Sequence, residues 1–92
     1  MKTHQDLDVW NESIDLTKII YDFTKSFPRH ELFGLSSQMQ RSAVSVASNI
    51  AEGASRGSNK EFIKFLHYSI GSISELETQV YIAKKPNYIS DV

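Results

Sequence analysis

The sequence predicts an all-α protein, an antiparallel up-and-down bundle of helices, from three observations. Apolar residues recur at steps of three and four over three long segments, the period of a helix with one buried face. No segment alternates apolar and polar residues as a half-buried strand would. The breaks between the segments are short and contain glycine or proline, and long helices joined by short loops pack as antiparallel neighbours.

The first helix is expected to run from Asp8 to Ser26. Its apolar residues form two adjoining stripes, which together are wider than one neighbouring helix would cover. Pro28 should end the helix, because the residue before a proline is pushed out of the helical region. Residues 29–34 are then a short loop. The two stripes hold Leu7, Trp10, Ile14, Thr17, Tyr21 and Thr24, and Leu16, Ile19, Ile20, Phe23 and Phe27.

The second helix should begin near Leu35, capped by Ser36 or Ser37, and end between Gly53 and Gly57. Read at helical spacing, residues 35–57 have three faces, which suits a helix in the middle of a bundle. One face is apolar, the second is small and would let another helix approach closely, and the third is polar. These faces are Leu35, Met39, Ala43, Val46, Ile50 and Gly53; Ala43, Ala47, Ala51 and Ala54; and Arg41, Ser45, Asn49, Glu52 and Arg56.

The third helix is expected to start after Ser58, because Ser58 and Glu61 have the spacing of a capping box before an apolar run. Pro86 should stop it. Between them the apolar positions step by four and three, as in a heptad repeat, and Phe65 and Ile70 widen the seam. The seam consists of Phe62, Leu66, Ser69, Ile73, Leu76, Val80 and Ala83.

The composition indicates one small domain, residues 1–92, with a marginal core of its own. Ten lysines and arginines stand against eleven acidic residues, so the strongly basic balance of a dedicated nucleic-acid binder is absent. The absence of cysteine excludes disulfides and thiolate metal sites and fits a reducing cytoplasm. The N-terminus opens no apolar run, and no stretch is long and apolar enough to span a membrane. A cytoplasmic protein is therefore expected.

Arg41, Asn49, Glu52 and Glu75 are predicted to form a structural polar network between the second and third helices. In a hairpin that turns at Gly57 and Ser58, Arg41 faces Glu75, and arginine with carboxylate is a pairing that a partly buried interface tolerates. A ligand-binding, nucleic-acid-binding or catalytic role for these residues is the less favoured alternative.

A line of basic residues, Arg56, Lys60, Lys64 and His67, follows at steps of four, four and three. The first three are candidate nucleic-acid-binding residues, through contacts with phosphate. The competing explanation is an ordinary solvated helix start. Tyr68, Tyr81 and Tyr88 are candidates for stacking on bases, although packing in the bundle or at an interface is the favoured role for each.

No pattern indicates a metal, a cofactor or a catalytic group. The carboxylate-bridged di-iron site of bundles needs Glu-x-x-His on two helices, but Glu52 is followed three residues later by Ser55, and Glu75 by Thr78. The three histidines are scattered over three segments, which argues against zinc. The serines lack the histidine and acid of a triad, and the glycines lack the lysine and strand of a P-loop.

Six short segments occur in one order along the chain and carry a family resemblance. They are Asp8-Val9-Trp10, Phe27-Pro28, Gly34-Leu35-Ser36-Ser37-Gln38, Ser48-Asn49-Ile50-Ala51-Glu52-Gly53, Lys60-Glu61-Phe62 and Glu75-Leu76-Glu77-Thr78-Gln79. In these segments the chain closely resembles the bacterial four-helix-bundle proteins that are encoded in intervening sequences of large-subunit ribosomal RNA genes. The accessory variability determinant of diversity-generating retroelements looks like a relative.

The resemblance implies an up-and-down bundle that assembles into a homo-oligomeric ring, typically a pentamer. For the retroelement relative it implies a reverse transcriptase and nucleic acid as partners. It also implies a fourth helix, whereas three are expected within the 92 residues, so the fourth family helix is absent or truncated here. We therefore expect a non-enzymatic oligomeric scaffold that binds RNA or DNA together with a partner protein. The alternatives are a protein-interaction module without nucleic acid and an enzyme with a site between subunits.

Overall fold

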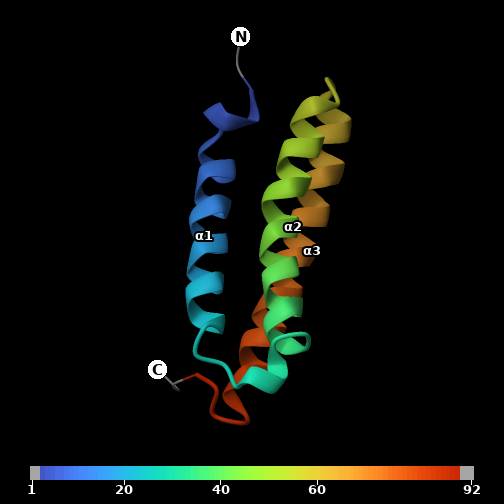
Figure 1. Cartoon of the computed structure of the whole chain (residues 1–92). Coiled ribbons are helices and arrows are strands. Elements are labelled where there is room, and N and C mark those ends of the chain that lie inside the picture. Colours follow the sequence, from blue (N-terminus) through green and yellow to red (C-terminus); the bar gives the residue numbers. More distant parts are fainter. Residues whose placement is uncertain (1–2, 90–92) are drawn as a thin grey trace.

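The computed structural model describes residues 3–89 and confirms the all-α class, with three long helices and no strand in that range. The long helices are α1 (Asp8–Thr24), α2 (Leu35–Ser55) and α3 (Asn59–Lys84), and Figure 1 shows their arrangement. Two single turns of 3₁₀ helix, η1 (His4–Asp6) and η2 (Arg29–Glu31), precede α1 and α2. Neither of these turns was predicted.

Helix α2 is the element on which both other long helices pack. Along the α2–α3 contact, residue numbers fall on α3 as they rise on α2, as the polar contacts Ser42–Glu75, Ser45–Ser72 and Val46–Ser69 show. Along the α1–α2 contact, residue numbers likewise fall on α1 as they rise on α2, as the contacts Thr24–Gln40 and Thr17–Ala43 show. Within residues 3–89, α1 and α3 meet through side chains rather than through close backbones.

The helix ends agree with the sequence in part. Helix α1 ends at Thr24, two residues before the predicted Ser26. Helix α2 begins at Leu35 as predicted, but the predicted serine cap is wrong. Gly34 is the capping residue, Ser36 is buried, and the Glu31 carboxylate accepts the hydrogen bond from the Leu35 N–H at 3.0 Å. A carboxylate from the preceding turn therefore supplies the acceptor that a serine was expected to supply.

The turn between α2 and α3 is formed as the sequence predicts. Gly57 has φ +76°, in the left-handed region that glycine adopts without strain. Ser58 caps α3, because its Oγ accepts from the Glu61 N–H at 3.1 Å. The Glu61 carboxylate turns to Lys64 instead of closing the second half of the capping box. At the other end of α3, Asn87 has φ +62° and the Tyr88 N–H donates to the Ala83 carbonyl, which turns Tyr88 back toward the bundle.

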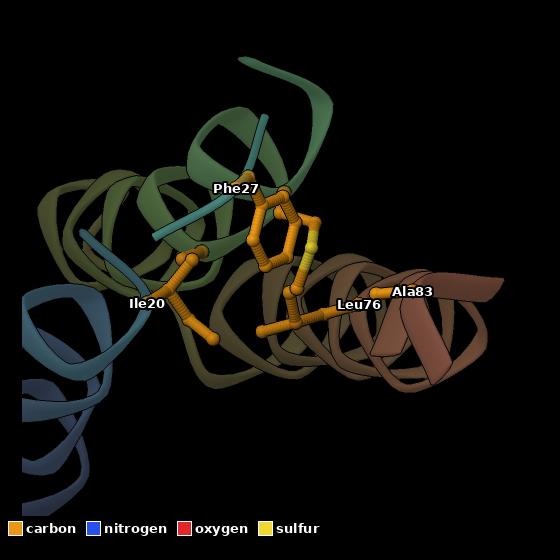
Figure 2. Close-up of a cluster of buried hydrophobic side chains, with 6 residues drawn as sticks. Ile20, Phe27, Leu76 and Ala83 are labelled. Atoms are coloured by element: carbon orange, nitrogen blue, oxygen red, sulfur yellow. The ribbon is translucent and has the colours of Figure 1, made fainter. Parts of the chain in front are cut away.

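The segment between α1 and α2, residues 25–34, is called the connector. The core lies where α1, the connector and α3 converge on α2. Figure 2 shows Ile20 of α1, Phe27 of the connector, and Leu76 and Ala83 of α3 gathered in one buried cluster, which Met39 and Ala43 of α2 complete. Fully burying one large apolar side chain contributes about 1.5–3 kcal/mol. This convergence is therefore what holds α1 and α3 on the same helix.

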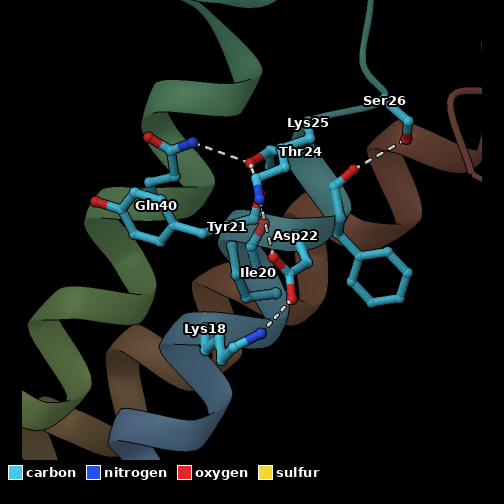
Figure 3. Close-up of polar contacts among 9 residues, drawn as sticks. Lys18, Ile20, Tyr21, Asp22, Thr24, Lys25, Ser26 and Gln40 are labelled. Atoms are coloured by element: carbon cyan, nitrogen blue, oxygen red, sulfur yellow. Dashed lines mark hydrogen bonds and ion pairs between the residues drawn. The ribbon is translucent and has the colours of Figure 1, made fainter.

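The α1–α2 contact combines small residues with side-chain hydrogen bonds. Ala43 and Ala47 are buried in it, and the Thr17 Oγ1 lies 3.4 Å from the Ala43 carbonyl oxygen. Farther along, the Gln40 amide donates to the Thr24 Oγ1 at 2.9 Å, which Figure 3 shows beside the exposed Lys18–Asp22 pair of α1. Small side chains on α2 thus allow α1 to approach closely enough for these bonds.

Many large apolar side chains are exposed on this fold. The connector carries the most exposed one, Phe33, at 92%, and Leu32 beside it is more than half exposed. On α1, four apolar residues of the predicted stripes are exposed: Ile14, Ile19, Tyr21 and Phe23. On α3 the exposed ones include Ile63, Ile70 and Ile73.

Candidate nucleic-acid interface

The predicted basic residues lie together at the end of the bundle where α2 passes into α3. Arg56 is the residue that follows α2, and Lys60 and Lys64 lie in the first two turns of α3. All three are exposed, as is His67 one turn farther on. Gly57 and the Ser58 cap fix this geometry, because they reverse the chain within a few residues and so bring Arg56 back beside α3.

The ring of Phe65 lies beside two of these cations. The Arg56 guanidinium carbon lies 4.9 Å from the ring centroid, and the Lys64 ammonium lies 5.3 Å from it. A cation over an aromatic face is attracted by the ring quadrupole, by about 0.5–1 kcal/mol at exposed sites. Phe65 was predicted only as part of the apolar seam, because the separation between Arg56 and Phe65 gives no hint of contact until the turn is known.

Two carboxylates partly neutralise the cations. Arg56 donates to Glu52 at 2.7 Å, one helical turn back, and Lys64 lies 3.2 Å from Glu61. Lys60 forms no ion pair with any residue in the range 3–89. Exposed pairs of this kind contribute only about 0–1 kcal/mol, so a phosphate group can compete with the carboxylates for Arg56 and Lys64. The patch therefore carries a small net positive charge, and two of its cations lie beside the Phe65 ring.

The four residues of the predicted polar network are not brought together. Asn49 donates to the Ser45 carbonyl and hydroxyl at 2.9 and 3.0 Å, Glu52 pairs with Arg56, and Glu75 accepts from Ser42. Arg41 is exposed and has no hydrogen bond or ion pair among the described residues. It lines a surface groove between α1 and α2, beside Tyr21.

The expected contact between Arg41 and Glu75 is replaced by a bond between Ser42 and Glu75, whose oxygens are 2.6 Å apart. The predicted register was wrong by one residue at this point. One residue rotates a side chain by about 100° around a helix, because there are 3.6 residues per turn. That rotation points Arg41 away from α3 and points Ser42 toward it.

Serines make the polar contacts between α2 and α3. Besides the Ser42–Glu75 bond, the Ser72 hydroxyl donates to the Ser45 hydroxyl at 2.9 Å, and the buried Ser69 hydroxyl donates to the Val46 carbonyl at 2.9 Å. These serine contacts were not predicted from the sequence. Their signal was the spacing of three between Ser42 and Ser45 and again between Ser69 and Ser72.

A second polar cluster lies at the opposite end of the bundle, where the segment after α3 meets the connector. The Tyr88 hydroxyl lies 3.0 Å from the Glu31 carboxylate and 3.1 Å from His30 Nε2, and the Tyr88 ring packs on Phe27. The Leu35 N–H, and after it the Tyr88 hydroxyl, lower the pKa of Glu31 by donating to its carboxylate. The same carboxylate raises the pKa of Tyr88. The cluster thus ties the end of α3 to the start of α2.

Residues 3–89 contain no group of three or more histidine or acidic side chains arranged to hold a metal ion. In the same range, no helix has the length and apolarity that crossing a membrane requires.

A family model described as "23S rRNA-intervening sequence protein" matches residues 5–92. No curated protein matches the chain.

Proposed function

The chain belongs to the 23S rRNA-intervening sequence protein family, and from this we propose that it is a non-enzymatic, self-associating scaffold that binds nucleic acid. The observation that carries the proposal is the basic patch at the α2–α3 turn, formed by Arg56, Lys60 and Lys64. Phe65 attracts two of its three cations and so restricts their side chains to some extent. Side chains that are already restricted lose less entropy when they bind phosphate, which favours binding. A structured RNA is the first ligand to test.

Self-association is supported by the apolar surface that a single chain leaves exposed. Ile19 and Phe23 on α1, and Phe33 in the connector, are about half exposed or more. Large exposed apolar surfaces on water-soluble proteins mark interfaces, and closed rings are a common arrangement of copies. We propose that the three helices form an antiparallel up-and-down bundle whose assembly covers this surface, in the ring of five that the family resemblance implies.

Assembly would also strengthen nucleic-acid binding. One patch of three cations, two of them paired with carboxylates, binds phosphate weakly. A ring presents the patch once per copy, and each further contact on the same strand then forms at a high effective concentration. A near-neutral chain can bind nucleic acid in this way without a strongly basic composition.

A protein-interaction module without nucleic acid is the second candidate function, and the exposure of Phe33 favours it. An almost fully exposed phenylalanine at the tip of a connector is suited to insert into a pocket of a partner protein.

A salt titration of RNA binding separates the two candidates. Binding of a fluorescently labelled, structured RNA is measured by anisotropy between 50 and 200 mM salt. The scaffold should bind with a log–log slope of about −2 to −3 for each engaged patch, because about three phosphate contacts release their counterions. An interaction module would give no salt-dependent signal, and that result would refute the nucleic-acid proposal.

A further inference from the structure

Tyr68 lies at the edge of the basic patch and presents an exposed aromatic ring. It belongs to α3, one turn after Lys64, and 51% of it is exposed. Its ring meets the Phe65 ring edge-on, with centroids 5.3 Å apart and planes at 84°. Since Phe65 touches Arg56, Lys64 and Tyr68, the three side chains surround a single supporting ring.

The two aromatic rings have different surroundings. Phe65 is half-buried and carries two cations. Tyr68 has no cation over its ring among the described residues, and about half of the residue is exposed beside its perpendicular contact with Phe65. Phe65 therefore lies against the charged groups, and Tyr68 offers a flat apolar face beside them.

Lys60, Lys64 and Tyr68 step by four along α3 and so lie on one stripe of the helix. Successive positions on this stripe are about 6 Å apart along the axis, so the stripe is about 12 Å long. A line of cations that ends in an exposed aromatic face is the arrangement by which proteins bind single strands, with the cations on the backbone and the ring against a base. A duplex would offer only its phosphates, because its bases are stacked on one another.

We propose that this stripe is a binding site for single-stranded nucleic acid, in which Tyr68 stacks on an unpaired base while Arg56, Lys60 and Lys64 contact the neighbouring phosphates. This inference rests on the proposed function and adds the class of ligand to it. The stacking is indifferent to base identity, since every base has a flat face. Preference should therefore follow strandedness rather than sequence.

The test compares three labelled 12-nucleotide probes on the full chain by fluorescence anisotropy. They are a thymidine single strand, a strand of the same length in which abasic sites replace the bases, and a duplex. The proposal expects the single strand to bind about tenfold more tightly than the abasic strand, the range expected for loss of base–aromatic stacking. Single-stranded RNA of the same length should behave like the DNA strand.

Variants then assign the preference to Tyr68. Tyr68→Ala should lose the tenfold preference and keep the affinity for the abasic strand, whereas Tyr68→Phe should keep both. Tyr81→Ala is the matched control, because Tyr81 is an exposed tyrosine of the same helix with a lysine, Lys84, over its ring at 5.0 Å, but it lies about 20 Å farther along. It should leave binding of every probe unchanged.

Three results would overturn the proposal in distinguishable ways. If all probes bind equally and charge reversal at Lys60 and Lys64 abolishes that binding, base stacking is refuted and the phosphate-binding scaffold is still supported. If no probe binds, both base stacking and the proposed nucleic-acid binding are refuted. A Tyr68→Ala variant with an altered oligomeric mass would place Tyr68 at a contact between copies. The comparison of base-containing and abasic strands on the parent protein needs no variant, so it shows whether a base is stacked even if Tyr68→Ala fails to fold.

Discussion

Gly53 of α2 packs against Phe65 of α3 so closely that a methyl group on the glycine would lie 2.7 Å from the Phe65 Cβ. The same methyl would lie 3.3 Å from the Phe62 carbonyl oxygen, so backbone as well as side chain is close. This contact sets the spacing of α2 and α3 just before the turn. It therefore also sets the position of Phe65, which carries the cations of the basic patch.

We expect Gly53→Ala to destabilise the protein by up to about 2 kcal/mol, because overpacking at this crossing outweighs the gain in helix propensity. The matched control is Gly71→Ala in α3, where an added methyl meets nothing within 4 Å. That change should stabilise by about 0.5–1 kcal/mol. Urea unfolding followed by circular dichroism measures both. A Gly53→Ala protein as stable as Gly71→Ala would contradict the close contact.

Ser42 and Glu75 should show coupling across the α2–α3 interface. A double-mutant cycle with Ser42→Ala and Glu75→Ala should give an interaction free energy of about 0.5–1.5 kcal/mol, as expected for one hydrogen bond. The parallel cycle with Arg41→Ala and Glu75→Ala should be additive, since Arg41 points into a different groove. Coupling in the Arg41 cycle and none in the Ser42 cycle would restore the register expected from the sequence.

The carboxylates beside the basic patch should weaken nucleic-acid binding. Glu52→Gln and Glu61→Gln each release one cation from an ion pair, so each should raise affinity for a single strand severalfold at low salt. Glu77→Gln, an exposed position of α3 that forms no ion pair within residues 3–89, controls for the change in net charge. Equal gains at all three positions would indicate a general charge effect.

Lys60→Glu combined with Lys64→Glu should abolish nucleic-acid binding and leave helicity and oligomeric mass unchanged. Both side chains are exposed and neither belongs to the core, so the fold should tolerate the reversal. Anisotropy, circular dichroism and light scattering check the three statements. Unaltered binding by the double variant would refute the phosphate contact.

Light scattering coupled to size exclusion should give a multiple of the 10.5 kDa chain at micromolar concentration. Ile19→Lys with Phe23→Lys on α1 should lower that mass, because two exposed apolar residues are replaced by like charges. Ile82→Lys, on a similarly exposed residue of α3, is the control. A folded monomer in the parent would end the self-association proposal, and a dimer would remove only the ring of five.

The Glu31–Tyr88 contact should make stability depend on pH at both extremes. The pKa of Glu31 is lowered in the folded state, so its contribution is present above its unfolded pKa and is lost as pH falls through the folded value. The pKa of Tyr88 is raised, so its contribution is complete below its unfolded pKa and is lost as pH rises through the folded value. Tyr88→Phe should remove the alkaline loss and move the pKa of Glu31 back toward its ordinary value. Nuclear magnetic resonance titration of the Glu31 carboxyl checks this, and an unchanged pKa would contradict the contact.

The helices, their breaks and the buried face of α2 were predictable because they depend on local patterns. Apolar spacing marked Met39, Val46 and Ile50 as inward-facing, and all three are buried. Ser58 and Gly57 marked the turn because capping and left-handed backbone depend on residue type. The prediction of a serine cap for α2 was wrong because the acceptor that replaces the serine, Glu31, comes from a 3₁₀ turn that has no pattern of its own in the sequence.

By itself, then, the sequence determined three helices, the inward face of α2 and the spacing of Lys60, Lys64 and His67 along α3. Tertiary structure alone decided which side chains meet. One residue of register replaces Arg41 by Ser42 opposite Glu75, since neighbouring positions on a helix point about 100° apart. The gathering of Arg56, Lys64 and Tyr68 around Phe65 likewise exists only once α2 and α3 cross at Gly53, because contacts between helices depend on their separation and rotation, which local spacing does not specify.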